Sequence, residues 1–197
     1  MILYGASGHA KVIIDILKKN KINISTIIDD NKDLKSILEL KVNPINKITI
    51  NETVLISIGN NKTRKLISEK LNTINYGRAI HPNTTIDNTS IIQEGTVVMA
   101  NVIINSSSNI GKHCIINTNS VIEHDCNIGD FVHVSPSATL CGNVTIGEGT
   151  HIGAGAIIIP NIKIGKWCVI GAGSVVIKDV PDNITMVGNP AKPIKEY

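Results

Sequence analysis

The stretch LCGNVTIGEGTHIGAGAIIIPNIKIGKWCVI, residues 140–170, places an aliphatic side chain at every sixth position. The same period runs without interruption from residue 80 to residue 176, so seventeen consecutive hexads keep one register. A six-residue repeat is typical of a left-handed parallel β-helix, in which each hexad forms a short strand and a turn and three hexads close a triangular coil. The seventeen hexads therefore predict a prism of nearly six coils. The aliphatic anchors are Ile80, Ile86, Ile92, Val98, Ile104, Ile110, Ile116, Ile122, Ile128, Val134, Leu140, Ile146, Ile152, Ile158, Ile164, Ile170 and Val176.

A second position of the hexad, four residues after each anchor, carries a small or β-branched side chain throughout the repeat. We expect this position to point into the narrow interior as well. Cys114, Cys126 and Cys168 occupy it, which favours a role as compact hydrophobic residues, whereas Cys141 is expected at the surface or an edge. No two cysteines have CxxC spacing, so the sequence indicates neither a zinc knuckle nor a redox pair. We expect reduced thiols.

Residues 1–78 have a different pattern, in which short apolar strands alternate with amphipathic helices. The strand-like segments are ILY, ISTIIDD and TVLISIGNN, and the helix-like segments are KVIIDILKKN and KTRKLISEKL. We interpret this pattern as an α/β, Rossmann-like β-α-β-α-β domain with a small parallel sheet flanked by helices. The predicted organisation is a ligand-binding domain over residues 1–78, followed by the β-helix with a short C-terminal tail over residues 79–197.

The composition argues against two classes of partner. Only 3% of the residues are aromatic and the net charge of +3 is spread over both halves, so we expect no nucleic-acid partner. No apolar run reaches the roughly 18 to 20 residues of a membrane span, and Met1 leads directly into a strand-like segment. We therefore expect a soluble, cytoplasmic protein.

Three loops are expected to meet beyond the carboxyl ends of the parallel strands, where ligands bind in such sheets. The GASGH loop frees backbone N–H groups at a helix N-terminus, which suits a phosphate, and the aspartates of IIDD suit ribose hydroxyls or a base N–H. The structural alternative is a tight turn capped by Ser7, with two surface aspartates. The candidate ligand-binding residues of the three loops are Ser7, Gly8, His9, Asp29, Asp30 and Gly59.

The segment SVIEHDCNIG, residues 120–129, interrupts the aliphatic repeat with three titratable side chains. His124 stands at the third place of its hexad, away from both inward positions, so we expect it to face outward beside Asp125. Histidine titrates near neutral pH, and a neighbouring carboxylate strengthens it as a base. The pattern therefore predicts a general base at His124 with Asp125 as its partner.

Four motifs, YGASGH, IIDD, ISIGNN and INTNSVIEHDCNIGDFVHVSPSATLCGNVTIG, resemble those of the bacterial N-acetyltransferases that act on nucleotide-linked amino sugars. The chain is most similar to the UDP-4-amino-sugar acetyltransferases of bacillosamine synthesis, within a group that includes sialic-acid O-acetyltransferase-like proteins. The resemblance covers the whole chain. It implies a homotrimer that binds acetyl-CoA in clefts between neighbouring prisms and holds the nucleotide sugar, expected to be a UDP-linked 4-amino deoxysugar, in the N-terminal domain.

The resemblance also implies a role for individual residues. His124 and Asp125 would be catalytic, with direct transfer from acetyl-CoA in a ternary complex and no metal. The residues implied to bind acetyl-CoA are Asn117, His133, Gly142, Ala154, Gly171 and Ala172. The residues implied to bind the nucleotide sugar are those of the three N-terminal loops, Ser7, Gly8, His9, Asp29, Asp30 and Gly59. His133 would contact the thioester carbonyl and is a candidate donor to the oxyanion.

The spacing of two histidines bears on how the site is assembled. His124 and His133 are nine residues apart, which is half of an 18-residue coil, so they are expected on opposite sides of one prism. Asn117 precedes His133 by 16 residues and is expected beside it, one coil away. We therefore predict that His124 of one subunit works with Asn117 and His133 of the partner subunit.

Three alternatives stay open. The first is an O-acetyltransferase for a sialic-acid-type sugar, and the second is a sugar-nucleotide sensor without activity. The third is a prism-shaped carbonic anhydrase, because His133 and His151 lie one coil apart as two zinc ligands could. His81, His113 and His151 are otherwise interpreted as structural or solvated.

Overall fold

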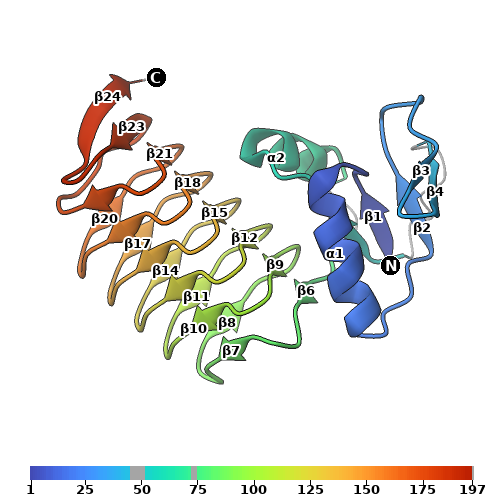
Figure 1. Ribbon diagram of the computed structural model, residues 1–197, viewed down its shortest axis with the longest axis horizontal. Coiled ribbons are helices and arrows are strands. Elements are labelled where there is room, and N and C mark those ends of the chain that lie inside the picture. Colours follow the sequence, from blue (N-terminus) through green and yellow to red (C-terminus); the bar gives the residue numbers. More distant parts are fainter. Residues whose placement is uncertain (45–51, 72–74, 197) are drawn as a thin grey trace.

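The computed structural model describes residues 1–44, 52–71 and 75–196, which form a small α/β domain followed by a long triangular β-helix (Figure 1). The sheet of the α/β domain has the order β3-β4-β2-β1-β5, in which β1, β2, β4 and β5 run parallel. The β1-α1-β2 unit and the step from β5 into α2 confirm the predicted Rossmann-like domain. The elements are β1 (Ile2–Tyr4), α1 (Gly8–Lys19), β2 (Thr26–Ile28), β3 (Ser36–Ile37), β4 (Leu40–Asn43), β5 (Val54–Ile56) and α2 (Asn61–Lys70).

A hairpin of β3 and β4 extends this sheet beyond what the sequence predicts. Its turn residues Leu38 and Glu39 have φ angles of 46° and 66°. Hairpin turns of type I′ require positive φ at both central residues, which is why asparagine and glycine are common there. A Leu-Glu pair gives no such signal, so the hairpin is not apparent from the pattern.

The β-helix consists of two-residue strands that stack in parallel into three sheets, as predicted from the hexads, and at its C-terminal end the longer strands β23 (Ile184–Val187) and β24 (Lys192–Glu196) pair antiparallel. The eight-stranded sheet contains β6 (Ala79–Ile80), β9 (Val97–Val98), β12 (Ile115–Ile116), β15 (His133–Val134), β18 (His151–Ile152), β21 (Val169–Ile170), β23 (Ile184–Val187) and β24 (Lys192–Glu196). The six-stranded sheet contains β7 (Thr85–Ile86), β10 (Ile103–Ile104), β13 (Val121–Ile122), β16 (Thr139–Leu140), β19 (Ile157–Ile158) and β22 (Val175–Val176). The five-stranded sheet contains β8 (Ile91–Ile92), β11 (Asn109–Ile110), β14 (Asn127–Ile128), β17 (Thr145–Ile146) and β20 (Lys163–Ile164).

The interior of the prism is built from the two inward positions of each hexad. The anchors from Ile92 to Val176 are at most 9% exposed, and they form one continuous hydrophobic core. Cys114, Cys126 and Cys168 are buried in that core, while Cys141 is partly exposed, so the predicted places of the cysteines are confirmed.

The corners of the prism hold a residue with positive φ in almost every hexad. Asn119, Asp125 and Phe131 follow one another at this position with φ angles of 59° to 61°. Asparagine and aspartate tolerate this conformation best among residues with a side chain, and glycine adopts it freely, as at Gly149 with φ of 70°. The backbone conformation of the corner is therefore by itself a sufficient reason for an aspartate at position 125.

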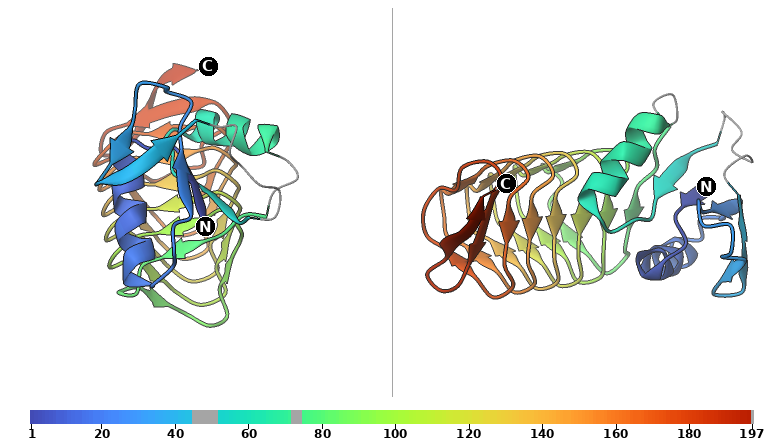
Figure 2. Two further views of the ribbon diagram at one scale, coloured as in Figure 1. Left: turned by 90° about the vertical axis from the view of Figure 1, so that its right-hand side faces the viewer. Right: turned by 90° about the horizontal axis from the view of Figure 1, so that it is seen from above.

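The α/β domain covers part of the outer face of the eight-stranded sheet. Ala79, Val97 and Ile115 point outward from successive coils and are buried in a core shared with α1, whose Ile13 and Leu17 pack in the same cluster. The right-hand view in Figure 2 shows the domain at the N-terminal end of the prism. The next residues of this outward row are His133 and His151, so the histidines begin where the covering core ends.

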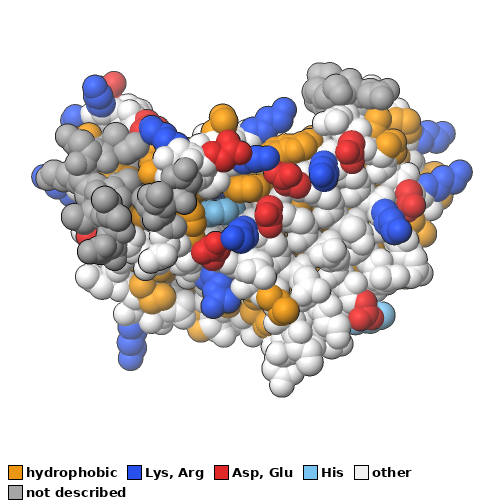
Figure 3. All heavy atoms as spheres, turned by 180° about the vertical axis from the view of Figure 1, so that it is seen from behind, with side chains coloured by type: hydrophobic (Ala, Val, Ile, Leu, Met, Phe, Trp, Pro, Cys, Tyr) orange, Lys and Arg blue, Asp and Glu red, His pale blue; other side chains and the backbone are white. Residues whose placement is uncertain are grey.

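The face shown in Figure 3 carries acidic and basic side chains in alternation, without a continuous basic stripe. Across residues 1–44, 52–71 and 75–196, no helix is both long and apolar enough to cross a membrane.

Candidate active site

The predicted site residues fall into two groups on opposite sides of the prism. His124 lies in the turn between β13 of the six-stranded sheet and β14 of the five-stranded sheet. His133 lies on β15 of the eight-stranded sheet, which forms the side of the triangular prism opposite that corner. The expected half-coil separation of the two histidines is therefore confirmed.

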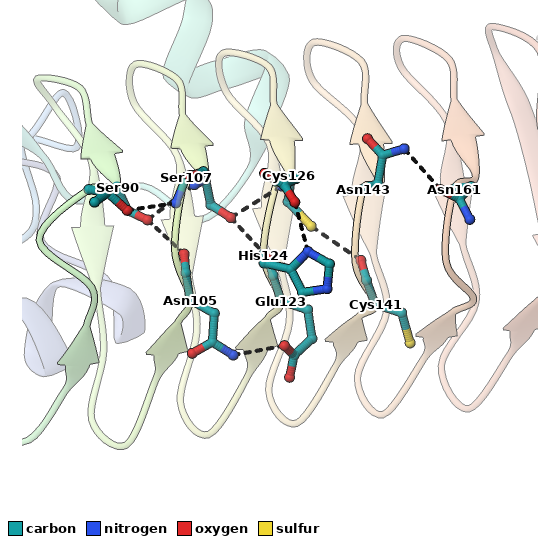
Figure 4. A network of polar contacts seen from close by, with 12 residues as sticks. Ser90, Asn105, Ser107, Glu123, His124, Cys126, Cys141, Asn143 and Asn161 are labelled. Atoms are coloured by element: carbon teal, nitrogen blue, oxygen red, sulfur yellow. Dashed lines mark hydrogen bonds and ion pairs between the residues drawn. The ribbon is translucent and has the colours of Figure 1, made fainter.

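The first group centres on an exposed pair. Nδ1 of His124 lies 2.8 Å from Oδ2 of Asp125, and each side chain is 59% exposed. Because Nδ1 faces the carboxylate, Nε2 is the ring nitrogen available to a ligand. The pair stands beside a polar ladder along the coils, in which Nδ2 of Asn105 donates to Glu123 at 2.8 Å (Figure 4).

A glycine makes room for the His124 ring. Gly142 lies one coil further along the prism, and a Cβ atom there would overlap Cε1 and Nε2 of His124. The imidazole therefore lies over the bare Cα of Gly142. Since the φ angle of Gly142 is not positive, it is the close approach of the ring that requires glycine here.

The second group is a layer of partly buried imidazoles next to the α/β domain. Oδ1 of Asn117 accepts the N–H of Thr118 at 2.8 Å, which turns Nδ2 toward Nε2 of His133 at 3.1 Å. Nε2 of His133 thus accepts from Asn117, and the ring proton belongs on Nδ1. Nδ1 is buried without a hydrogen-bond partner among the described residues, and the ring lies beside the backbone of Gly59.

Burial keeps these imidazoles neutral. Loss of solvation, followed by the charges of His151 and Arg64, lowers the pKa of His133 to about 3. Burial and the Arg64 charge lower the pKa of His9 to about 4, and the same two causes lower the pKa of His151. Near neutral pH, His133 therefore acts as a neutral donor or acceptor and not as a cation.

The three predicted loops do meet at one edge of the N-terminal sheet. Ser7 is the N-cap residue of α1, but its side chain makes no capping hydrogen bond. The alternative in which Ser7 caps the helix is therefore not observed. No described atom lies within 4 Å of where a Cβ would stand at Gly8 or Gly59, so both loops present open backbone.

The two aspartates beside these loops are already engaged within the chain. Asp29 accepts the backbone N–H of Ala6 at 2.7 Å and that of Asn31 at 2.8 Å. Asp30 accepts from the buried hydroxyl of Tyr4 at 3.0 Å. Asp29 therefore braces the GASGH loop, a role that the sequence does not reveal.

A cavity of about 490 Å³ connects the α/β domain to the histidine layer. It is lined by the loop from Gly59 to Lys62, by His133 and His151, and further along the prism by Trp167 and Asn183. Lys62, Trp167 and Asn183 are lining residues that the sequence does not single out.

Comparison with known proteins bears on the function of this arrangement. A model of the PglD N-terminal domain matches residues 1–71, and a model of the GMPPB C-terminal domain matches residues 98–196. A histidine-to-asparagine variant of perosamine N-acetyltransferase from Caulobacter crescentus, in complex with CoA and GDP-perosamine, is 32% identical and superimposes with a TM-score of 0.93 over 99% of this chain and 96% of its own.

Two further solved structures agree with it. The acetyltransferase domain of PglB from Neisseria gonorrhoeae, also solved with acetyl coenzyme A, is 33% identical with a TM-score of 0.92 and covers 98% of both chains. WeeI from Acinetobacter baumannii is 32% identical, with a TM-score of 0.90 and 98% coverage of both chains. The chain belongs to the hexapeptide-repeat amino-sugar N-acetyltransferases. No curated protein sequence matches it significantly.

The remaining residues implied to bind acetyl-CoA lie on a different corner of this acetyltransferase from His124. Ala154 follows β18, and Gly171 and Ala172 follow β21, so all three stand between the eight-stranded and six-stranded sheets. Within one prism, the structure brings Gly142 to His124 and Asn117 to His133, but it keeps these two pairs apart.

The zinc alternative lacks a ligand set in this acetyltransferase. The rings of His133 and His151 are tilted by 43° with their centroids 4.7 Å apart, but Nε2 of His133 faces Asn117 and Nε2 of His151 lies 2.9 Å from Ser135 Oγ. In the described ranges, no three His, Cys, Asp or Glu side chains gather as a metal site would require.

Proposed function

We propose that this acetyltransferase transfers the acetyl group of acetyl-CoA to the 4-amino group of a nucleotide-linked amino deoxysugar, with His124 as the general base. The observation that carries the proposal is the pair formed by His124 and Asp125 at a corner of the prism, in which the His124 side chain is 59% exposed and Nδ1 faces the carboxylate, so that Nε2 is left for a ligand. Membership of the family supports the reaction class, and the bound CoA and GDP-perosamine of the Caulobacter crescentus relative support the two ligands.

The proposed step is direct transfer in a ternary complex. The amine nitrogen bonds to the thioester carbon while Nε2 of His124 takes its proton, and the carboxylate of Asp125 stabilises the resulting imidazolium. Collapse of the tetrahedral intermediate breaks the C–S bond, and the imidazolium returns the proton to the CoA thiolate. A neutral His133 would donate to the oxyanion from Nε2 only in its other tautomer, with the proton moved from the buried Nδ1 to Nε2 and the Asn117 amide turned away.

We propose that each site is shared by two subunits of a homotrimer. The corner with His124 and Gly142 of one subunit would face Asn117 and His133 of the partner subunit, with acetyl-CoA in the cleft between the prisms. Ala154, Gly171 and Ala172, which lie toward the same side as His133, would contact the pantetheine arm. The exposure of His124 in a single chain is consistent with a wall supplied by a second copy.

The nucleotide sugar is proposed to lie across Ser7, Gly8, His9 and Gly59, with its sugar directed to the cavity over His133. Asp30 would face the nucleoside, and Asp29 would hold the phosphate loop in place through Ala6. The motif resemblance favours UDP.

The test is a panel of 4-amino sugars linked to UDP, GDP, dTDP or CMP, offered with acetyl-CoA while thiol release is followed and the product is identified by mass spectrometry. We expect turnover of a UDP-linked 4-amino sugar, with an amide as the product. Preference for a GDP-linked sugar would overturn the proposal that the nucleotide is UDP. An ester product would favour the sialic-acid-type O-acetyltransferase. Binding without turnover across the panel would favour the sensor.

A further inference from the structure

Arg64 of α2 is fully buried between the α/β domain and the β-helix. Its side chain is 1% exposed, and all its N–H groups have acceptors within 3.1 Å. Among the described residues no carboxylate pairs with it. The acceptors are the carbonyl oxygens of Ile58, Gly59, His113 and Phe131 and the amide oxygen of Asn61.

These contacts join two different parts of the molecule. On one side, the guanidinium holds the carbonyls of Ile58 and Gly59, which form the loop at the rim of the histidine cavity. On the other side, it holds the carbonyls of His113 and Phe131, which occupy the same corner of two successive coils. One side chain therefore fixes the height of the loop along the prism.

Asn61 continues the same contact on the next coil. Its Nδ2 donates to the carbonyl of Gly149 at 3.0 Å, and residues 113, 131 and 149 are 18 apart, which is one coil each. Three residues of an α-helix rise about 4.5 Å, and stacked strands are about 4.8 Å apart, so Asn61 and Arg64 match the spacing of the coils. The first turn of α2 is thus in register with three coils.

The residues buried on α2 are consistent with this contact between the helix and the coils. Its buried residues are Asn61, Arg64, Ile67 and Ser68, whereas Leu66 is 66% exposed. Ile67 packs in the hydrophobic cluster of the N-terminal sheet, so the helix meets that sheet through an apolar side chain. It meets the prism through the polar side chains of Asn61 and Arg64, which reach the corner carbonyls, and the right-hand view in Figure 2 shows the helix lying over the coils.

We propose that Arg64 is a positioning residue for the proposed reaction: together with Asn61, it holds the Gly59 loop at one fixed height on the β-helix, beside His133. A shift by one coil would move the loop by about 4.8 Å along the row of histidines. The unpaired charge of Arg64 also lies near His9, His133 and His151 and favours their neutral form. The proposal rests on the proposed function for the identity of the ligand at Gly59.

The test compares Arg64→Gln with Lys65→Met in the full chain. Lys65 lies on the same helix and contacts Glu148 of the prism at 2.5 Å, so its loss weakens docking of α2 without touching the loop carbonyls. We expect Arg64→Gln to lower kcat/KM for the nucleotide sugar about 10- to 100-fold, mainly through KM, with the KM for acetyl-CoA unchanged. Lys65→Met should leave both constants near those of the unsubstituted protein.

Crystal structures of both variants without substrate supply a second readout. We expect the distance from Gly59 to His133 to change by about 1 Å or more in Arg64→Gln and not in Lys65→Met. If Arg64→Gln does not fold, Asn61→Ser replaces it under the same criteria. An unchanged distance, or an equal rise of KM in Lys65→Met, would overturn the proposal. If the unsubstituted protein turns over no nucleotide amino sugar, the proposed function fails, and the crystal comparison still decides the role of Arg64.

Discussion

At the scale of single residues, the proposed reaction depends on one exposed imidazole. Removing His124 should slow the reaction without disturbing the fold, because its side chain is 59% exposed and the anchor Ile122 carries the packing of that hexad. We expect His124→Ala to lower kcat by roughly two to four orders of magnitude, with little change in the KM for acetyl-CoA. Steady-state kinetics measure this, and a fully active variant would exclude His124 as the base.

The partner of the base should matter less than the base itself. Asp125→Asn keeps a residue that tolerates the corner φ of 61° and removes the carboxylate beside Nδ1. We expect a smaller fall in kcat than for His124→Ala, because the change removes the group that orients the ring through Nδ1 and leaves the base itself in place. If kcat is unchanged, Asp125 has no catalytic role and serves only as a residue suited to the corner conformation.

Gly142 offers a separate test of the His124 position. The methyl group of Gly142→Ala would meet the imidazole and displace it, and we expect kcat to fall about 10- to 100-fold while the melting temperature stays the same. In a His124→Ala background the same change should cost nothing further, because the displaced ring is absent. A raised KM for acetyl-CoA with an intact kcat would instead assign Gly142 to the cofactor cleft.

At the scale of elements, the layer between α2 and the prism corner makes stability depend on pH. His113 stacks on Phe131 with ring centroids 5.1 Å apart and meets the edge of Tyr76 at 4.4 Å. Burial and the charge of Arg64, against the opposing charges of Glu94 and Asp130, lower its pKa to about 4. His9 on α1 and His133 and His151 on the eight-stranded sheet also have lowered pKa values.

The sign of this dependence follows from the direction of the shifts. A histidine with a lowered pKa in the folded state stays neutral while the unfolded chain takes up a proton near pH 6.5, so its contribution is complete above that pH. Between pH 6.5 and about 4 the unfolded state binds more protons, and stability is lost. We expect the free energy of unfolding to fall between pH 7.5 and 5.5, a window above the titration of most carboxyl groups.

His113→Phe should reduce this loss. Phe131 and Trp167 occupy the same corner position with φ angles of 59° and 56°, so an aromatic side chain fits the backbone there. We expect the fall in the free energy of unfolding between pH 7.5 and 5.5 to shrink by about 1 kcal/mol. Urea unfolding at the two pH values measures it. An unchanged difference would show that His113 does not contribute to the pH dependence.

At the scale of the whole molecule, the triangular cross-section separates groups that the proposed reaction needs together. His124 stands at the corner opposite the sheet that carries His133, so a single prism cannot bring both to one acetyl group. We expect inactive His124→Ala and inactive His133→Ala proteins, unfolded and refolded together, to regain a fraction of activity. Some interfaces would then pair an intact His124 with an intact His133.

The control for this experiment is each variant refolded alone, with mixed assembly verified by differently tagged chains. If mixed oligomers form and their activity stays at the level of the separate variants, the site does not span two subunits. Recovery of activity would support a site shared between subunits and the assignment of His133 to the partner side of the cleft.

The sequence alone determined the features that depend on local repetition. Each hexad repeats one backbone shape, so the inward anchors, the small interior position and the outward place of His124 beside Asp125 all follow from the period of six. The same period predicted that Asn117 meets His133 across one coil. Repetition makes these contacts effectively local, because one coil fixes the geometry of the next.

Only the tertiary structure decided how the α/β domain lies on the prism. The contact of Arg64 with His113 spans 49 residues and that of Asn61 with Gly149 spans 88, and neither follows from any periodic pattern. The bracing of the GASGH loop by Asp29 and the turn at Leu38 and Glu39 also depend on neighbours distant in sequence or on an unusual turn pair. A hydrophobic period predicts which face is buried, but not which backbone carbonyls a buried guanidinium will find, because those partners are brought together only when two separately folded parts dock.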